Sequence, residues 1–543
     1  MRKLTRAAYL LPVMCLVAAE AAYFADALSP LRWCAGLTWM SFSVAAVLSS
    51  WVAALIPFFS RYFWTCRHRA WYLVAFFLPP VLILFDAGGV RFTTVDIEGL
   101  QQLAAGMFML RHDPSLGVFA VTYGRYMDRQ FLLNCLPSLL LGPSLWAARV
   151  GNSMFYIGSY CFFLSSLVAY LRKRREPDPM LFAGYCGILI AFGQYTLLNA
   201  RKFEQTMMPV GCMLFFLAAL LCFLIQQGPL RFLWLTWAFG FFTGCYTPGL
   251  AGWVLGLAVL IYLIARGRER ILVLTVIYGT ECLCITYLAM QRMRPGLLSS
   301  EFRVGTDGHL TFGDWVLRCM SGVRAAVGSD FTLVPAPLAL AIGAGVYLGW
   351  RLRDYRYAAV CAWAAATAVL GIVLLGTEFA FPNRDIQRAM IVIPPLALGT
   401  VVLLTRFLCD SKEAQGAAGT AKLLMKLSMG YMVFTGVFTV LLVRSFFGTT
   451  MLDDEDEAFV LVDRLVHSHE VQPKLIYMTP PMDINLAPGL QYFAPDAKVV
   501  HGNPPAGEKV AGAYVLSYLK TYRFDDELVP SRNPRPFIRM ERE

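Results

Sequence analysis

A succession of long apolar segments runs through this chain and limits its possible fold more than any other feature. A helix that crosses a membrane needs about 20 mostly apolar residues, and by that measure we expect about thirteen spans. The expected spans lie near residues 8–28, 34–59, 70–88, 145–171, 180–199, 207–226, 231–246, 249–265, 271–290, 332–350, 357–376, 389–408 and 427–447. Because 57% of the 543 residues are hydrophobic and only 15% are charged, the sequence predicts an all-α polytopic membrane protein.

The basic residues gather in alternate loops between the spans. The net charge of +11 would suit a nucleic-acid partner, but these residues lie in short loops, where they set topology and contact anionic lipid headgroups. We therefore exclude nucleic acid. If every span crosses once, the groups at 172–175, 266–270 and 351–356 fall on one side. That asymmetry predicts a cytoplasmic N-terminus and a C-terminus on the opposite side.

Three segments on the non-cytoplasmic side are longer than simple turns, and such loops are often functional. They are 89–144, 291–331 and everything after 447. We expect two additional N-terminal helices in 1–69, a transmembrane core in 70–447 and a small α/β domain in 448–543, with strands at 473–477 and 497–500. The low-complexity stretch 414–419 is interpreted as a flexible cytoplasmic loop.

The cysteines and acidic residues give little sign of a metal. Most of the 14 cysteines fall in apolar spans, where Cys behaves as a small hydrophobic residue, and no zinc-type spacing is visible. The acidic run 453–457 precedes a helical pattern, so it is interpreted as a helix N-terminus. We expect no metal site.

The first long loop opens with the acidic motif Asp96-Ile97-Glu98. Apolar positions that begin at Leu100 and Leu103 follow at helical spacing, which predicts an amphipathic helix on the membrane surface. Acids that precede a helix are also favoured there as capping groups, because the helix N-terminus carries a partial positive charge. Both interpretations of the motif, chemistry and capping, remain open at this point.

The loop resembles the first extracytoplasmic loop of GT-C class glycosyltransferases, in the branch of the protein O-mannosyltransferases and the lipid A aminoarabinose transferases. In that branch the loop opens with an adjacent Asp-Glu pair, whose Asp matches Asp96. A second resemblance is the run from Leu141 to Arg149, where the loop returns to the membrane. We call Gly142, Trp146 and Arg149 the loop-return motif.

The resemblance implies a GT-C fold and transfer of a sugar from a polyprenyl-phosphate donor to an envelope acceptor, which is a lipid, a glycan or a protein. It implies Asp96 and Glu98 as catalytic residues, with inversion at the sugar, and no certain cofactor besides the lipid-linked donor. Two departures stand out: Ile97 separates the acids, and a basic-Pro-Pro phrase is missing, with Arg129 near its place. The family branch also implies a bacterial inner membrane, with the C-terminus periplasmic.

Positive charge is needed to hold the departing phosphate, and outer helix ends supply it. The residues that we expect to bind the donor phosphate are Arg201, Lys202, Arg384, Arg388 and Arg129. For each of the first four residues, an equally weighted alternative is that the side chain only reaches lipid headgroups.

Two other functions stay open. Glu20 and Glu281 lie within predicted spans, where a carboxylate is costly and often functional, as in a transporter or flippase for a lipid-linked or polar solute. The altered acid pair would also suit a non-catalytic partner in envelope assembly. We favour the glycosyltransferase because a transporter has no need of an acidic outer loop or of a soluble tail.

Overall fold

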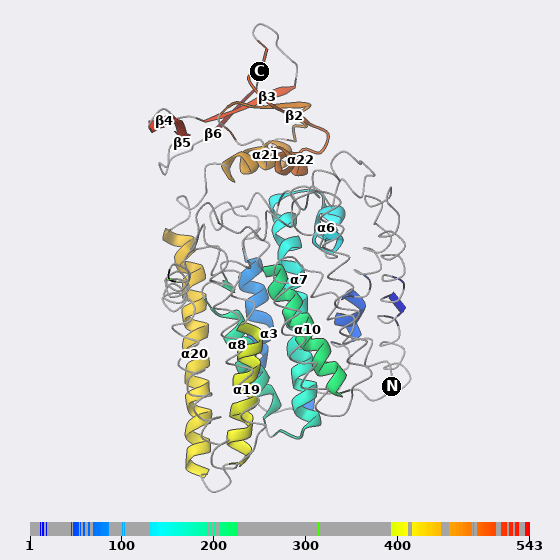
Figure 1. Ribbon diagram of the computed structural model, residues 1–543, viewed down its shortest axis with the longest axis vertical. Coiled ribbons are helices and arrows are strands. Elements are labelled where there is room, and N and C mark those ends of the chain that lie inside the picture. The colour runs from blue at the N-terminus through cyan, green and yellow to red at the C-terminus, as the bar shows by residue number, and fades with distance from the viewer. Residues whose placement is uncertain are drawn as a thin grey trace.

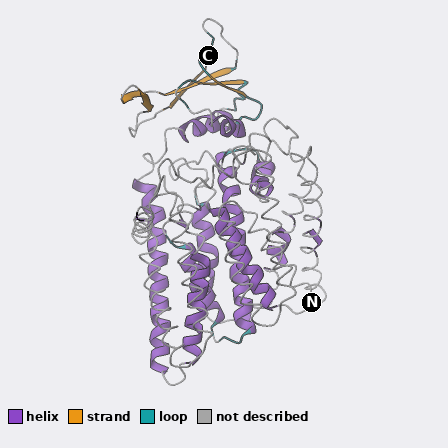
Figure 2. Ribbon diagram, in the orientation of Figure 1, coloured by secondary structure: helices purple, strands orange, loops and turns teal. Residues whose placement is uncertain are grey.

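The computed structural model describes parts of the chain, most of which are helical. The described ranges are 69–85, 131–176, 178–193, 207–225, 393–410, 415–446, 456–468, 470–480, 486–505, 512–518, 521–524, 527–530 and 538–542, with short pieces between them. Figure 1 shows a bundle of helices with a small sheet beyond one end, and Figure 2 separates the two kinds of structure.

The described part of the bundle consists of helices that correspond to predicted spans or adjoin them. They are α3 (Arg69–Leu84), α6 (Phe131–Leu141), α7 (Leu145–Lys173), α8 (Pro179–Ala191), α10 (Met207–Ile225), α19 (Ile393–Asp410) and α20 (Gln415–Phe446). In the part of the chain that the structure describes, α7 is the one helix that is long and apolar enough to cross a membrane, and several shorter apolar helices accompany it. The helix predicted over 145–171 is confirmed.

Helix α7 lies at the centre of the described bundle and packs against α6, α10, α3 and α8. Its buried hydroxyl group on Tyr160 donates a hydrogen bond to the Ala75 carbonyl oxygen of α3 at 2.6 Å. Two glycines allow close approach, as small residues do between membrane helices. A Cβ at Gly211 would lie 2.7 Å from the Phe155 ring, and one at Gly187 would lie 2.7 Å from the Tyr160 hydroxyl oxygen.

The start of α20 corrects one expectation from the sequence. The stretch 414–419 is not a loop throughout, because α20 begins at Gln415. Alanine has the highest helix propensity, which offsets the glycines in this stretch. One turn further on, the Lys422 ammonium donates to Asp178 Oδ2 at 2.6 Å and thereby ties α20 to the beginning of α8.

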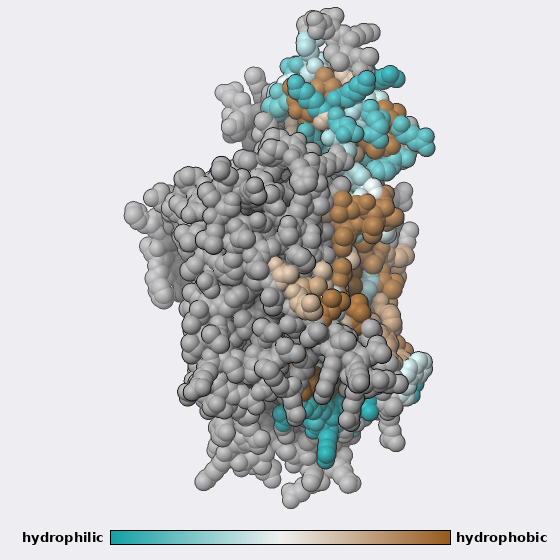
Figure 3. All heavy atoms as spheres, turned by 90° about the vertical axis from the view of Figure 1, so that its right-hand side faces the viewer, coloured by the Kyte–Doolittle hydropathy of each residue, from teal (hydrophilic) through white to brown (hydrophobic). Residues whose placement is uncertain are grey.

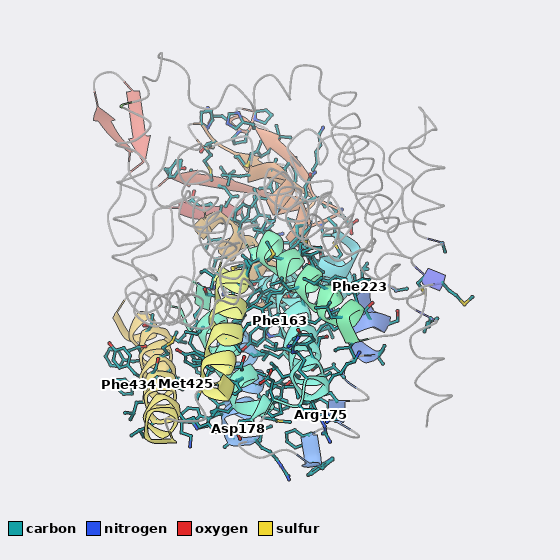
Figure 4. The ribbon with its side chains drawn as sticks, turned by 60° about the horizontal axis from the view of Figure 1, so that its bottom comes forward. Phe163, Arg175, Asp178, Phe223, Met425 and Phe434 are labelled. Carbon is teal, nitrogen blue, oxygen red and sulfur yellow. The ribbon has the colours of Figure 1, made fainter. Side chains whose placement is uncertain are left out.

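One face of α20 is apolar and exposed. Leu427, Phe434 and Phe438 are 60%, 67% and 53% exposed, whereas Met425 is buried. Figure 4 shows Phe434 and Met425 on this helix. Residues three or four apart share a helix face, so α20 presents a continuous apolar stripe. Figure 3 shows a wider hydrophobic zone between more polar ends on another side of the molecule. Both features suit a surrounding lipid bilayer.

The tail is a small α/β unit. Its elements are α21 (Asp456–Ser468), β1 (Leu475–Met478), α22 (Ala487–Phe493), β2 (Lys498–His501), β3 (Ala513–Tyr518), β4 (Thr521–Phe524), β5 (Glu527–Pro530) and β6 (Ile538–Arg542). The sheet order is β2-β1-β3-β6, with β1 parallel to β2 and β3 and with β6 antiparallel to β3; β4 and β5 form a separate pair. The two strands predicted near 473–477 and 497–500 are confirmed.

Helices α21 and α22 lie between the sheet and the helical bundle (Figure 1). Their apolar faces share one core with the strands and with the outer end of α7. In that core Phe459, Leu490 and Ile476 pack together with Leu145 and Ala148. The tail is therefore not a detached domain, because its core continues into the bundle.

Candidate functional site

The loop-return motif begins in the connection between α6 and α7 and continues onto the first two turns of α7. Gly142 follows the last residue of α6 with a φ of +87°, a left-handed conformation that glycine adopts without steric cost. Ser144 is extended and caps α7: its hydroxyl oxygen accepts a hydrogen bond from the Ala147 N–H at 3.1 Å. The glycine and the serine therefore have local structural reasons to occupy this turn.

The other two motif residues point to different surroundings. Trp146, on the first turn of α7, is 43% exposed and follows the exposed apolar end of α6, where Leu140 is 79% exposed. An exposed indole beside leucines is typical of a membrane–water interface. Arg149, on the second turn, is only 3% exposed. A buried guanidinium needs acceptors or negative charge nearby.

The tail supplies that negative charge through Asp463 of α21. Asp463 Oδ1 accepts a hydrogen bond from the Leu145 N–H at 3.1 Å and lies 3.1 Å from His467 Nδ1. Burial raises the pKa of the Asp463 carboxyl from its usual 3.8, and the Leu145 N–H, His467 and Arg149 partly oppose the rise. The carboxylate therefore lies at the positive N-terminal end of α7 and within the field of Arg149.

A second polar contact joins the tail to the same turn. The Tyr492 hydroxyl of α22 lies 2.5 Å from the Ser138 hydroxyl of α6, and it donates to the Ser144 carbonyl oxygen at 3.4 Å. Burial raises the pKa of Tyr492 well above its usual value, so it stays neutral. Both ends of the loop-return turn are thus held by the tail.

The acidic loop is anchored at this place as well. Leu100 and Leu103 are helical and buried, and they share the core of Leu145 and Ala148. The Cys135 thiol of α6 donates to the Leu103 carbonyl oxygen at 3.7 Å. Asp96 and Glu98 themselves lie outside the described residues, a few positions before Leu100.

Ala200 directly precedes Arg201 and Lys202, the pair of basic residues expected to bind phosphate, and it is anchored one turn further along α7. The Ser153 hydroxyl lies 2.8 Å from the Ala200 carbonyl oxygen and 2.9 Å from that of Arg149. Ala200 is buried. Arg201 and Lys202 follow directly in the sequence but lie outside the described residues, as do Arg129, Arg384 and Arg388.

The structure thus places the three motif residues in the α6–α7 connection and on the first two turns of α7, and it adds partners that the sequence analysis missed. These are Ser138, Ser144, Asp463 and Tyr492. For Asp463 a signal was available, since it follows the buried Phe459 by four residues and precedes the buried Val466 by three. An acid within the apolar stripe of a helix is an informative position. Among the described residues no group of three His, Cys, Asp or Glu side chains could hold a metal.

The raised pKa of Asp463 leads to a pH prediction. The folded state binds this proton more tightly, so its contribution to stability is complete below 3.8 and is lost as pH rises through the folded pKa. We expect the Tm of wild type minus that of Asp463→Asn to fall as pH rises above 3.8, the usual pKa of the carboxyl. Thermal unfolding of the purified full chain measures it, with Arg464→Gln, an exposed neighbour, as control. A difference that grows with pH would contradict the assignment.

No family model matches the chain, and no curated protein matches it in sequence. Among solved structures, the chain is similar to ArnT from Cupriavidus metallidurans. The apo crystal structure is 15% identical with a TM-score of 0.50, covering 79% of this chain and 85% of that one. The structure of ArnT bound to undecaprenyl phosphate is 14% identical with a TM-score of 0.52, covering 80% and 86%.

A third similar structure is the Archaeoglobus fulgidus oligosaccharyltransferase in complex with Zn and sulfate, at 12% identity and a TM-score of 0.42, covering 86% of this chain and 68% of that one. The likeness to ArnT, a GT-C protein, shows the fold. The chain therefore has an ArnT-like GT-C membrane fold, mostly helical with a small sheet. The fold implied by the sequence resemblance is confirmed.

Proposed function

We propose that this protein is a membrane glycosyltransferase that moves a sugar from a polyprenyl-phosphate donor to an envelope acceptor on the extracytoplasmic face. The observation that carries the proposal is the meeting of two anchors on the outer turns of α7. Leu100, which follows the acidic motif, belongs to the same hydrophobic core as Ala148, and Ala200, which precedes the basic pair, accepts a hydrogen bond from Ser153.

Simple chain geometry shows why these anchors matter. Ala148 and Ser153 are separated by about 7.5 Å along the helix axis. The four residues from Asp96 to Leu100 span at most about 14 Å, and Arg201 adjoins Ala200. The proposal therefore assigns the Asp96 carboxylate and the Arg201 and Lys202 cations to the same end of α7, where they act on one substrate.

The proposed reaction needs a base and a phosphate clamp. Asp96 accepts the proton of the acceptor hydroxyl or amine as that group attacks the anomeric carbon. The bond between this carbon and the phosphate oxygen breaks, its electron pair leaves with the phosphate, and the configuration inverts. Cationic side chains stabilise the departing charge. We assign that role to Arg201, Lys202, Arg384, Arg388 and Arg129, and a supporting role to Glu98.

The donor class and the sidedness are part of the same proposal. The ArnT structure with bound undecaprenyl phosphate supports a polyprenyl lipid as donor, while the acceptor is a lipid, a glycan or a protein. The described basic residues Arg172 and Lys173 lie at the end of α7 opposite the tail, which supports a cytoplasmic N-terminus and a periplasmic tail. We place the protein in a bacterial inner membrane, with about thirteen spans.

The domain boundaries are also proposed. Two additional helices occupy 1–69, the catalytic core occupies 70–447 with outer loops 89–144 and 291–331, and the extracytoplasmic domain occupies 448–543. The shared core of the tail and α7 supports a tail that works together with the catalytic core.

Mass spectrometry of the cell envelope tests the function. Cells that lack this protein are compared with cells complemented by wild type or by Asp96→Asn at matched expression. We expect one sugar-sized mass to be absent from the deletion, restored by wild type and absent again with the variant, because the base is lost. An envelope that is unchanged by the deletion, or fully restored by Asp96→Asn, would contradict the proposal.

A further inference from the structure

Asp463 occupies a position where an apolar side chain would pack more easily. It lies on the side of α21 that faces the bundle, between the buried Phe459 and Val466, while the adjacent Arg464 is exposed. Taking a carboxylate out of water is costly unless it is well paired. The raised pKa of Asp463 reports this cost. Stability of the tail therefore gives no reason for an acid here, whereas its partners on α7 do.

Those partners are the first two turns of α7. The Leu145 N–H begins the helix and has no acceptor within it, and Asp463 supplies one at 3.1 Å. The negative charge also complements the positive end of the helix. Arg149 lies one turn further, and its charge acts on Asp463. The Asp463 carboxylate thus acts on both the Leu145 backbone N–H and the buried Arg149 cation.

The same two turns hold the anchors of the candidate site. Leu145 shares one hydrophobic core with Leu100, which follows the acidic motif. The Ser153 hydroxyl donates to the carbonyl oxygens of Arg149 and of Ala200, which precedes the basic pair. A shift of these turns would therefore displace Leu100 and Ala200 together, and with them the segments that contain the acidic motif and the basic pair. Catalytic groups misplaced by about 1 Å lose roughly 100-fold in rate.

We propose that Asp463 is a positioning residue through which the soluble tail sets the geometry of the candidate active site, by capping α7 at Leu145 and balancing the charge of Arg149. The inference rests on the proposed glycosyltransferase function. In this role Asp463 touches no substrate. It holds α7 in the position in which the acid and the cations act together.

The first part of the test reads the cap without reference to any reaction. Amide hydrogen exchange is measured on the full chain in nanodiscs for wild type, Asp463→Ala and Arg464→Gln. We expect exchange at Leu145 to quicken about tenfold in Asp463→Ala, since one charge-assisted hydrogen bond is lost. In the same variant, exchange in β1 and β3 should equal that of wild type. In Arg464→Gln, exchange should equal that of wild type in every segment. Unchanged exchange at Leu145, or a general loss of protection in the tail, would overturn the proposal.

The second part reads catalysis. Sugar transfer is measured with the lipid-linked sugar pool extracted from the deletion strain, using wild type, Asp463→Asn and Asp463→Glu. We expect Asp463→Asn to lower kcat about tenfold with KM for the donor within about twofold, because positioning is lost while binding groups remain. Asp463→Glu keeps the charge and should recover most of the rate. Equal loss in both variants, or a change in KM alone, would overturn the proposal.

A separate outcome bears on the proposed function. If wild type transfers no sugar under conditions in which Asp463→Ala still quickens exchange at Leu145, the capping contact stands but the glycosyltransferase assignment fails. If wild type transfers sugar and Asp463→Asn does so equally well, the glycosyltransferase assignment stands and the positioning role fails. Binding of undecaprenyl phosphate to wild type and to Asp463→Asn, expected to agree within about twofold, shows whether the variant keeps an intact lipid site.

Discussion

Replacement of Asp96 by Asn is expected to lower the initial rate of sugar transfer by about 10²- to 10⁴-fold, the usual contribution of a general base. The reaction is followed in membranes that contain equal amounts of wild type or variant. The expected loss is in kcat, because Asn keeps the size and most hydrogen bonds of Asp while it cannot accept the proton.

The same substitution separates catalysis from helix capping. Asn caps a helix N-terminus about as well as Asp does, so a capping role predicts a variant with nearly full activity and unchanged Tm. Glu98→Gln is the matched comparison. On a helix or turn, the residue inserted between the acids rotates the second carboxylate by about 100°. We therefore expect Glu98→Gln to lower the rate of sugar transfer less than Asp96→Asn does. A larger loss for Glu98→Gln than for Asp96→Asn would reverse the assignment of the base.

Replacement of Gly151 by Ala is expected to have the largest effect on the fold. A Cβ at Gly151 would collide with the Asn134 carbonyl oxygen, which is backbone and cannot turn away. Helices α6 and α7 would have to separate just below the loop-return motif. We expect a loss of roughly 3 kcal/mol in stability, at the upper end for overpacking, and a matching loss of sugar transfer. Thermal unfolding in nanodiscs measures the first effect.

Gly430→Ala is the control for this prediction. Among the described residues, a Cβ at Gly430 would meet only the Trp71 ring within 4 Å, at 3.9 Å, an ordinary van der Waals contact. Ala favours a helix over Gly by about 1 kcal/mol, so the variant should be as stable as wild type or more so. If both variants lower the Tm equally, the effect is a general intolerance of Ala and the close approach of α6 to α7 is not its cause.

The sequence could predict features that depend on neighbouring residues. The apolar run after Ser144 predicts α7, and the resemblance of the run from Leu141 to Arg149 singles out Gly142, whose positive φ explains that glycine. Short apolar runs predicted β1 and β2. In contrast, the helix α6 was hidden within the first outer loop, since its 11 residues are too few for a span and include Pro137.

The sequence could not show contacts between distant parts of the chain. Asp463 and Leu145 are 318 positions apart, and Ser138 and Tyr492 are 354 apart. No local pattern pairs such residues, because the pairing follows from how the tail packs on the bundle. The roles of Asp96, Glu98 and the expected phosphate-binding residues stay predictions, with only their anchors at Leu100 and Ala200 in the described part of the chain.

A reconstituted assay measures the proposed sugar transfer itself. Purified wild-type protein in nanodiscs is supplied with the polyprenyl-phosphate sugars and the envelope acceptors of the deletion strain. Mass spectrometry then quantifies the lipid-linked sugar, the free polyprenyl phosphate and the acceptor that carries the sugar. A glycosyltransferase should consume the lipid-linked sugar and release equal amounts of free polyprenyl phosphate and of acceptor that carries the sugar. Donor that remains intact and only changes leaflet, or free polyprenyl phosphate without a modified acceptor, would contradict the proposed glycosyltransferase activity.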